Sequence, residues 1–184
     1  VIRADTGVAA ATLQRTAVLH RYNAFLWDLM RPYVGRRILE VGSGTGVMTR
    51  YLAIRERIVA SELDPHYVDL LRLTFADNPN VEVRPLDLAK LGEDGLAAHS
   101  FDTVVCSNVL EHVEDDAKAL REMRALLAPG GRVVLVIPAL RQLHGAIDDA
   151  IGHYRRYTRT EIEEKLRAAG LGVEHVSYFN MLGV

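Results

Sequence analysis

The sequence predicts an α/β fold, a doubly wound and mostly parallel sheet with helices on both faces. Three observations predict it. Short apolar runs, typical of buried parallel strands, alternate along the chain with segments of helical periodicity. A glycine-rich loop follows the first of these runs. The length of 184 residues and the apolar fraction of 49% suit one compact domain with a filled core.

We expect this single domain to cover residues 1–184, with residues 1–35 as an N-terminal helical extension and residues 36–184 as the core. The extension carries an apolar helical face beside Asn23. It predicts a helix packed beside the sheet or, alternatively, a lid over a bound ligand, with Tyr22 and Asn23 nearest that ligand and Tyr22 able to touch a substrate. The face consists of Leu19, Tyr22, Leu26 and Met30.

Six strands are expected in the core. Each is a short run rich in apolar and β-branched residues. They are Arg37 to Val41, Arg57 to Glu62, Val81 to Arg84, Phe101 to Cys106, Arg132 to Ile137 and Val173 to Phe179.

Helix start and stop signals separate these strands. Asp64 supplies an N-cap and Pro65 a first-turn proline, and apolar residues follow at helical spacing. Two further helices have equally clear ends. One has the stripe Val113, Ala117, Leu120 and Leu127 and stops at Pro129-Gly130-Gly131; the other starts with the capping box Thr158 and Glu161 and stops at Gly170.

Composition and charge narrow the function. The balance of 22 basic against 24 acidic residues offers no large positive field, so we expect a small-molecule partner and no nucleic acid. The single cysteine, Cys106, excludes an internal disulfide and is expected to be a buried apolar residue. The longest apolar run, Val133 to Ile137, is too short to span a bilayer. These features predict a cytoplasmic protein and leave the oligomeric state open, a dimer included.

The glycine-rich loop predicts a nucleotide-like ligand. Residues Ile38 to Gly46 read ILEVGSGTG, which places Gly42, Gly44 and Gly46 at every second position around Ser43. A dinucleotide fingerprint has the wider spacing G-x-G-x-x-G. Glu40 would repel a pyrophosphate, but it suits a ligand that carries an ammonium group and a sulfonium.

This loop resembles the first motif of class I S-adenosylmethionine-dependent methyltransferases, which have a Rossmann-like fold. The resemblance implies that Glu40, Gly42, Ser43, Gly44 and Gly46 bind S-adenosylmethionine, with S-adenosylhomocysteine as the product. It also implies a seventh, antiparallel strand, and only five residues follow Phe179. Either the sequence is truncated, so that this strand is missing, or another segment replaces it.

Two more acids follow strands in the order that an adenosyl ligand would need. Glu62 ends the second strand and could accept both ribose hydroxyls, with Leu63 against the adenine. Asp87 and Leu88 match positions at which class I methyltransferases read the adenine. Alternatively, Glu62 and Asp87 are helix or turn caps.

The segment from Phe101 to Val113 resembles the motif after the fourth strand in methyltransferases of ubiquinone biosynthesis, a small-molecule methyltransferase type 11/12. The resemblance extends from Ile38 to about Gly172 and places Asn108 at the reactive end of the cofactor. Some of these enzymes bind a metal through E-x-x-E-H. Asn108 replaces the first glutamate here, so we expect no metal, although Glu111 and His112 keep one open.

His112 is a candidate general base, because an imidazole titrates near neutral pH and could take the proton of an attacking hydroxyl. The alternative is that it begins a helix and binds a neighbouring loop.

The stretch from Asp148 to Thr158 contains the string G-H-Y-R-R-Y-T, which resembles a subgroup of small bacterial methyltransferases. His153 and Asp148 could act as base and orienting acid. Tyr154 is a candidate for substrate binding. Arg155 or Arg156 could hold a carboxylate or phosphate of the substrate. Alternatively, the two arginines pair with Glu161, Glu163 or Asp149 and fix the loop.

Together these patterns predict a methyltransferase that transfers a methyl group to a small molecule, first of all to an oxygen nucleophile. Two alternatives remain. One is a module that binds S-adenosylmethionine without turnover. The other is a nicotinamide-dependent oxidoreductase, which would favour the wider glycine spacing and a Tyr-x-x-x-Lys pair that the chain lacks.

Overall fold

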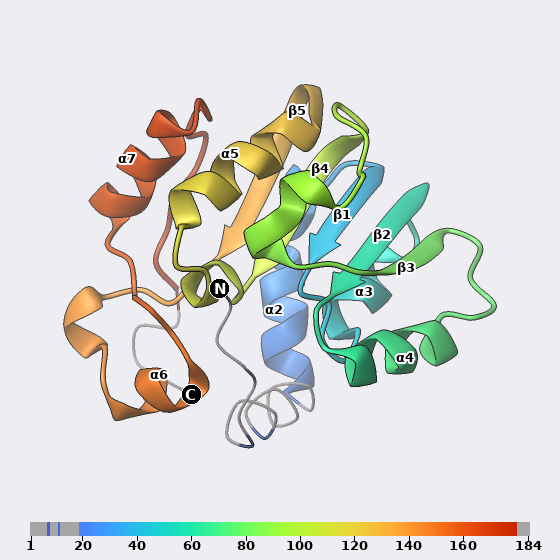
Figure 1. The fold of residues 1–184 in the computed structure, drawn as a ribbon, viewed down its shortest axis with the longest axis horizontal. Helices are drawn as coiled ribbons and strands as arrows, with labels where there is room; N and C mark the ends of the chain where they lie inside the picture. The colour runs from blue at the N-terminus through green and yellow to red at the C-terminus, as the bar shows by residue number, and fades with distance from the viewer. Residues whose placement is uncertain (1–6, 8–10, 12–18, 180–184) are drawn as a thin grey trace.

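The computed structural model describes residues 7, 11 and 19–179, and the rest of the expected N-terminal extension lies outside these residues. Within them the chain forms a five-stranded sheet of parallel strands in the order β3-β2-β1-β4-β5 (Figure 1). The doubly wound parallel sheet expected from the sequence is confirmed. The strands are β1 (Arg37–Val41), β2 (Arg57–Glu62), β3 (Val81–Pro85), β4 (Phe101–Ser107) and β5 (Leu127–Val136).

The helices α4 and α7 follow the expected signals, but the stop expected at Pro129-Gly130-Gly131 is wrong. The helix α5 ends at Leu126, and these three residues lie within β5, which begins at Leu127 and not at Arg132. Asp64 accepts a hydrogen bond from His66 N–H at 2.8 Å, and Thr158 and Glu161 form the expected capping box. The α-helices are α2 (His20–Met30), α3 (Val47–Leu52), α4 (Pro65–Thr74), α5 (Asp116–Leu126), α6 (Ala146–Ile151) and α7 (Arg159–Ala168), and the 3-10 turns are η1 (Arg31–Tyr33), η2 (Leu88–Glu93), η3 (Leu110–His112) and η4 (Arg141–Leu143).

Alternate residues of the central strands face opposite helical layers. In β1, Leu39 packs in the cluster that contains α5 and α7, whereas its neighbour Ile38 packs in the cluster that contains α2 and α3. In β4, Val104 and Val105 divide in the same way. Cys106 is buried as expected, and this burial raises the pKa of its thiol. The core thus holds the carboxyl ends of β1 and β4 rigidly in the middle of the sheet.

The expected strand from Val173 to Phe179 is not formed, which corrects the sequence-based prediction. Among the described residues, this segment has no ladder partner and is held by side chains instead. Glu174 pairs with Arg132 of β5 at 3.0 Å, His175 stacks on Tyr33, and Arg159 donates to the carbonyl of Val176 at 2.7 Å. A run rich in apolar residues does not make a strand without a backbone partner.

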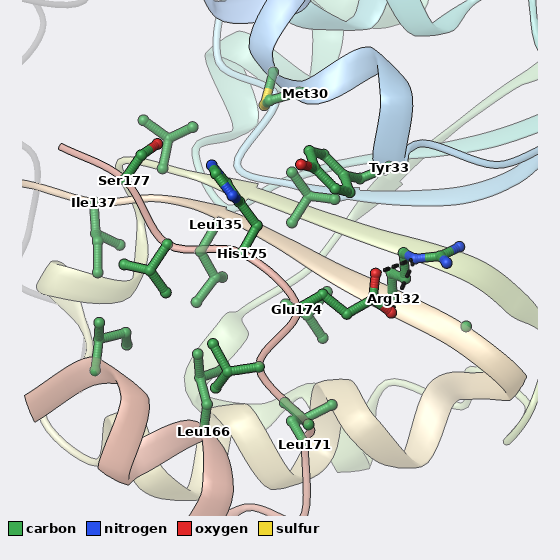
Figure 2. Close-up of a pocket in the computed structure, with 18 of the residues that line it drawn as sticks. Met30, Tyr33, Arg132, Leu135, Ile137, Leu166, Leu171, Glu174, His175 and Ser177 are labelled. Atoms are coloured by element: carbon green, nitrogen blue, oxygen red, sulfur yellow. Dashed lines mark hydrogen bonds and ion pairs between the residues drawn. The ribbon is translucent and has the colours of Figure 1, made fainter. Parts of the chain in front are cut away.

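A cavity of about 960 Å³ lies between β5 and this extended segment (Figure 2). Met30 and Tyr33 line one side, Leu135 lies on β5, Leu166 lies on α7, and His175 belongs to the extended segment. The glycine loop, Glu62 and His153 do not line it. The cavity therefore belongs to the outer edge of the sheet rather than to the crevice at the strand ends.

No helix within the described residues is both long enough and apolar enough to cross a bilayer.

Candidate active site

The order of the strands reverses between β1 and β4, and the crevice beyond such a switch point is where open α/β sheets bind ligands. The glycine loop leaves β1 here. Gly42 has a φ of +72°, and a Cβ on it would lie 2.2 Å from Cγ2 of Val109, which follows β4. Gly46 is equally confined, since its Cβ would lie 2.9 Å from Leu71 of α4. The loop therefore has this path only with glycine at these positions.

Glu40 anchors the loop from inside. Its side chain is buried, and its Oε2 accepts hydrogen bonds from the hydroxyls of Ser43 at 2.8 Å and Thr49 at 2.6 Å. Burial raises the pKa of this carboxyl to about 7. The carboxyl is thus directed at the loop's own hydroxyls, and contact with a cofactor ammonium stays a prediction.

This pKa makes the stability of the protein depend on pH. The pKa of this carboxyl is near 4.5 in the unfolded chain and near 7 in the folded protein. Because the folded state binds the proton more tightly, protonation contributes to stability. The full contribution is present below pH 4.5 and is lost as the pH rises through 7. Relative to Glu40→Gln, the wild-type free energy of unfolding should fall by about 3 kcal/mol between pH 4.5 and 8. Urea denaturation at both pH values measures it. Glu56→Gln, at an exposed surface pair, is the control and should show no such difference. If the free energies of unfolding of the wild type and Glu40→Gln differed by the same amount at both pH values, the raised pKa of Glu40 would be contradicted.

Glu62 lies in the crevice and contacts the glycine loop. Its Oε2 accepts from Gly44 N–H at 2.8 Å, and its Oε1 accepts from the N–H groups of Leu63 at 2.7 Å and Asp64 at 3.1 Å. Asp64, not Glu62, caps α4. The alternative of Glu62 as the helix cap is therefore wrong. Leu63 is 45% exposed, so an apolar surface for a ring lies next to this acid.

Asp87 lies at the end of β3, one residue after Leu86, whose N–H donates to the carbonyl of Glu62 at 2.9 Å. The Asp87 carboxylate caps η2 by accepting from Ala89 N–H at 2.9 Å, and the Leu88 side chain is buried in the core. These geometries favour the alternative in which Asp87 is a cap. The four positions Glu40, Gly44, Glu62 and Asp87 nevertheless lie at the ends of adjacent strands.

Asn108 lies at the end of β4 with a φ of +54°, and its N–H donates to the carbonyl of Val136 at 2.8 Å. Its side chain is exposed, as a residue that borders a ligand crevice should be. Tyr22 lies on α2 and is half-buried against the cluster that contains α2 and α3, which raises its pKa. The helix-beside-the-sheet interpretation of α2 is thus supported, since Leu26 and Met30 are also buried.

A second group of polar side chains gathers where η3 meets the loop after α6. The N–H of Tyr154 donates to the carbonyl of Glu111 at 2.9 Å and joins the two segments. His153 Nδ1 lies 2.8 Å from Asp148 Oδ1, and His153 Nε2 lies 3.7 Å from Glu111 Oε1. The rings of His112 and His153 meet edge to face at 4.7 Å. The structure therefore brings the expected catalytic residues Asp148, His112 and His153 together.

The electrostatics of this group follow from its burial. Burial raises the pKa of Glu111 to about 8, and burial together with His153 lowers the pKa of His112 to about 4. Burial also lowers the pKa of His153. For Asp148 burial would raise the pKa, but hydrogen bonds from Arg156 and His153 outweigh it and hold the pKa at about 2. A charged Asp148 thus faces neutral imidazoles near pH 7.

Both arginines are engaged in ion pairs within the protein. Arg156 Nε lies 2.8 Å from Asp148, and Arg155 Nη1 lies 2.8 Å from Asp116. Tyr154 lies against Arg155, whose guanidinium is 5.7 Å from the ring centre. These contacts favour the structural interpretation of the arginines, but with partners other than the Glu161, Glu163 or Asp149 expected from the sequence. Sequence reasoning missed Asp116, because its partners lie about 40 to 50 residues away and no motif marks it.

The comparisons with known proteins agree with this geometry. A family model described as "Methyltransferase domain" matches residues 39–135, more than half of the chain. A protein of Xanthomonas euvesicatoria pv. vesicatoria named ubiquinone biosynthesis O-methyltransferase is 31% identical over 160 residues. The match covers 78% of this chain and 65% of that relative, so the chain spans less than two thirds of the relative's length.

Solved structures share the fold. An S-adenosylmethionine-dependent methyltransferase from Mesorhizobium loti matches with a TM-score of 0.71 and 24% identity over 83% of this chain and 84% of that one. The trans-methyltransferase CalH, solved as a complex with SAH, matches with a TM-score of 0.60 and 29% identity over 79% of this chain and 47% of CalH. The chain therefore belongs to the methyltransferase domain family and has the class I fold of the enzymes that use S-adenosylmethionine.

Proposed function

We propose that this chain is an S-adenosylmethionine-dependent methyltransferase that transfers a methyl group to an oxygen atom of a small molecule. The contact between Glu62 and Gly44 N–H carries the proposal, because it joins a carboxylate suited to ribose hydroxyls to the glycine loop of a methyltransferase-family domain. The name of the Xanthomonas relative supports oxygen as the accepting atom, and CalH with SAH supports the cofactor.

The residues of the crevice fit the adenosyl part of the cofactor. An ionised carboxylate has about four acceptor sites. Three backbone N–H groups occupy three of the acceptor sites of Glu62, which leaves one site for a ribose hydroxyl. If the N–H of Gly44 were displaced, the carboxylate could accept from the second ribose hydroxyl as well. Leu63 would pack on the adenine ring and lose its exposure to water. When bound, the cofactor supplies a methyl group on a positively charged sulfonium, which is a good leaving group.

The chain's own contribution to such a transfer is mainly alignment, because little further activation is required. Asn108 and η3 lie at the switch point and would border the acceptor. His153 is only 9% exposed, and its Nε2 faces Glu111. Since a general base must reach the proton that it removes, this burial argues against direct proton transfer to His153.

The test is calorimetric titration with S-adenosylhomocysteine, followed by a search for its production from S-adenosylmethionine with phenols, alcohols and amines. Binding with turnover on hydroxyl acceptors supports the proposal. Binding without turnover on any acceptor would favour the non-catalytic module, and stabilisation by NAD in place of S-adenosylhomocysteine would favour the oxidoreductase.

Glu62→Gln should weaken S-adenosylhomocysteine binding by about 10-fold or more, because hydrogen bonds to a charged group contribute about 1.5–3 kcal/mol. The amide oxygen of glutamine can still accept from the backbone N–H groups, so the fold should persist. Glu82→Gln, at an exposed surface pair on β3, is the matched control and should bind like the wild type. Equal affinities of the Glu62 and Glu82 variants would place the ribose elsewhere.

A further inference from the structure

Glu111 places a buried carboxyl group next to His153. It is fully buried, and neither of its carboxyl oxygens has a hydrogen-bond partner among the described residues. An unpartnered carboxyl in the interior is costly, and native structures rarely leave one without a reason. Its Oε1 faces Nε2 of His153 at 3.7 Å, which is too long for a hydrogen bond. The space between these atoms therefore calls for a bridging atom.

His112 completes the group. One ligand atom each from Glu111, His112 and His153 lie within 4.8 Å of one another. Two ligands at about 2.1 Å from one zinc ion lie roughly 3.4 Å apart at the tetrahedral angle. The observed separations thus match a shared ion after a contraction of at most about 1.4 Å.

The outer contact of His153 has the pattern of a metal ligand. His153 Nδ1 lies 2.8 Å from Asp148, which is charged and also held by Arg156. Histidines that bind metals usually donate their other N–H to a carboxylate or a backbone carbonyl, which fixes the ring and directs the free lone pair at the ion.

We propose that Glu111, His112 and His153 bind one divalent transition-metal ion of the Zn²⁺ type. Two imidazoles and one carboxylate suit such an ion better than Mg²⁺, which prefers oxygen ligands. The expectation of no metal was based on Asn108, but the set that the fold assembles does not need this residue. Its third ligand comes from the loop after α6 instead, a partner that local spacing could not reveal.

The site would leave at least one coordination position for water or an oxygen of a bound molecule. Since η3 directly follows β4, this position would lie on the side of the crevice that we assign to the acceptor. Binding of the ion itself does not rest on the proposed function. It is measured without cofactor or acceptor, so its failure and that of methyl transfer can be told apart.

The experiment uses chelator-treated protein titrated with Co²⁺, which reports N/O coordination by its visible absorption, and then with Zn²⁺ and Mg²⁺ by calorimetry. We expect one equivalent of Co²⁺ or Zn²⁺ and much weaker binding of Mg²⁺. Glu111→Gln should weaken Zn²⁺ binding at least 10-fold. Asp148→Asn, which keeps an acceptor for His153, should weaken it by about 10- to 100-fold.

His66→Gln, an exposed residue at the start of α4, is the matched control and should bind Zn²⁺ like the wild type. Because the Glu111 variant removes a buried group, its fold is checked by circular dichroism. If it does not fold, imidazole ¹⁵N shifts of the wild-type protein decide, and Zn²⁺ should move two of the seven histidines. Absence of binding, unchanged affinity in the folded Glu111 variant, or a preference for Mg²⁺ would each overturn the proposal.

Discussion

Gly42→Ala is expected to destabilise the protein by about 3 kcal/mol or more and to remove measurable binding of S-adenosylhomocysteine. Two effects add at this position. A side chain in the left-handed region costs about 1–2 kcal/mol, and overpacking typically costs a further 1–3 kcal/mol. The new Cβ would lie 2.2 Å from Cγ2 of Val109, so either the loop or η3 must move. Urea denaturation and calorimetric titration measure the two losses.

Gly95→Ala separates the two effects. Gly95 has a φ of +67°, and nothing among the described residues lies within 4 Å of its added Cβ, so this variant should show only the backbone strain. Val109→Ala removes the atom that the Gly42 variant meets. In a double-mutant cycle, Val109→Ala should therefore reduce the cost of Gly42→Ala toward that of Gly95→Ala. Equal costs for both alanine variants in the wild-type background would show that Val109 does not confine the loop.

Asp116→Ala is expected to cost about 3 kcal/mol, the second largest effect. The carboxylate is buried, and it accepts from Lys165 Nζ at 2.7 Å, Arg155 Nη1 at 2.8 Å and Tyr157 Oη at 3.0 Å. Its removal leaves two cations and a phenol without their partner, which costs about 3–5 kcal/mol when the site is fully buried. Lys165 and Arg155 are partly exposed, so water compensates some of the loss and the lower figure applies.

The ion pairs of Asp116 should lose their contribution to stability at low pH. Burial alone would raise the pKa of Asp116, but the hydrogen bonds from Lys165 and Arg155 outweigh it and lower the pKa. A depressed carboxyl pKa gives stability that is present above the unfolded value and lost as the pH falls through the folded value. Glu163→Ala, which removes a partly exposed surface pair with Arg167, is the control and should change the free energy of unfolding by less than about 0.5 kcal/mol. Similar values for both variants would refute the role of Asp116.

Local patterns predicted the parts of the fold that local forces decide. The bounds of β1 and β2 followed from apolar runs between charged residues, and α4 and α7 followed from their caps. The segment from Val173 to Phe179 is also rich in apolar and aromatic residues, yet it lacks a strand partner within the described residues. Pairing is a property of the whole sheet, so the segment's own residues could not decide it.

The candidate site divides in the same way. Glu62 and the glycine loop were found because their chemistry is concentrated in short motifs. The ion pair of Arg155 with Asp116 and the meeting of Glu111 with His153 depend on how the loop after α6 returns to β4. Each joins residues about 40 positions apart, so only the folded chain reveals them. Arg156 pairs with Asp148 only 8 positions away, within the stretch that the sequence had singled out.

The strand order also has a kinetic consequence. β1 lies beside β4, and its Ile38 is in register with Thr103, so the middle of the sheet cannot close until the chain has been made well past its midpoint. Asp102, on β4, stabilises the pairing of β1 with β4 by accepting hydrogen bonds from the N–H groups of Arg36 and Arg37 at 2.9 to 3.0 Å. Non-local parallel pairing folds slowly. During synthesis on the ribosome, β1 will therefore have an unpaired edge until β4 has been made, and in that interval the nascent chain is exposed to edge-to-edge aggregation.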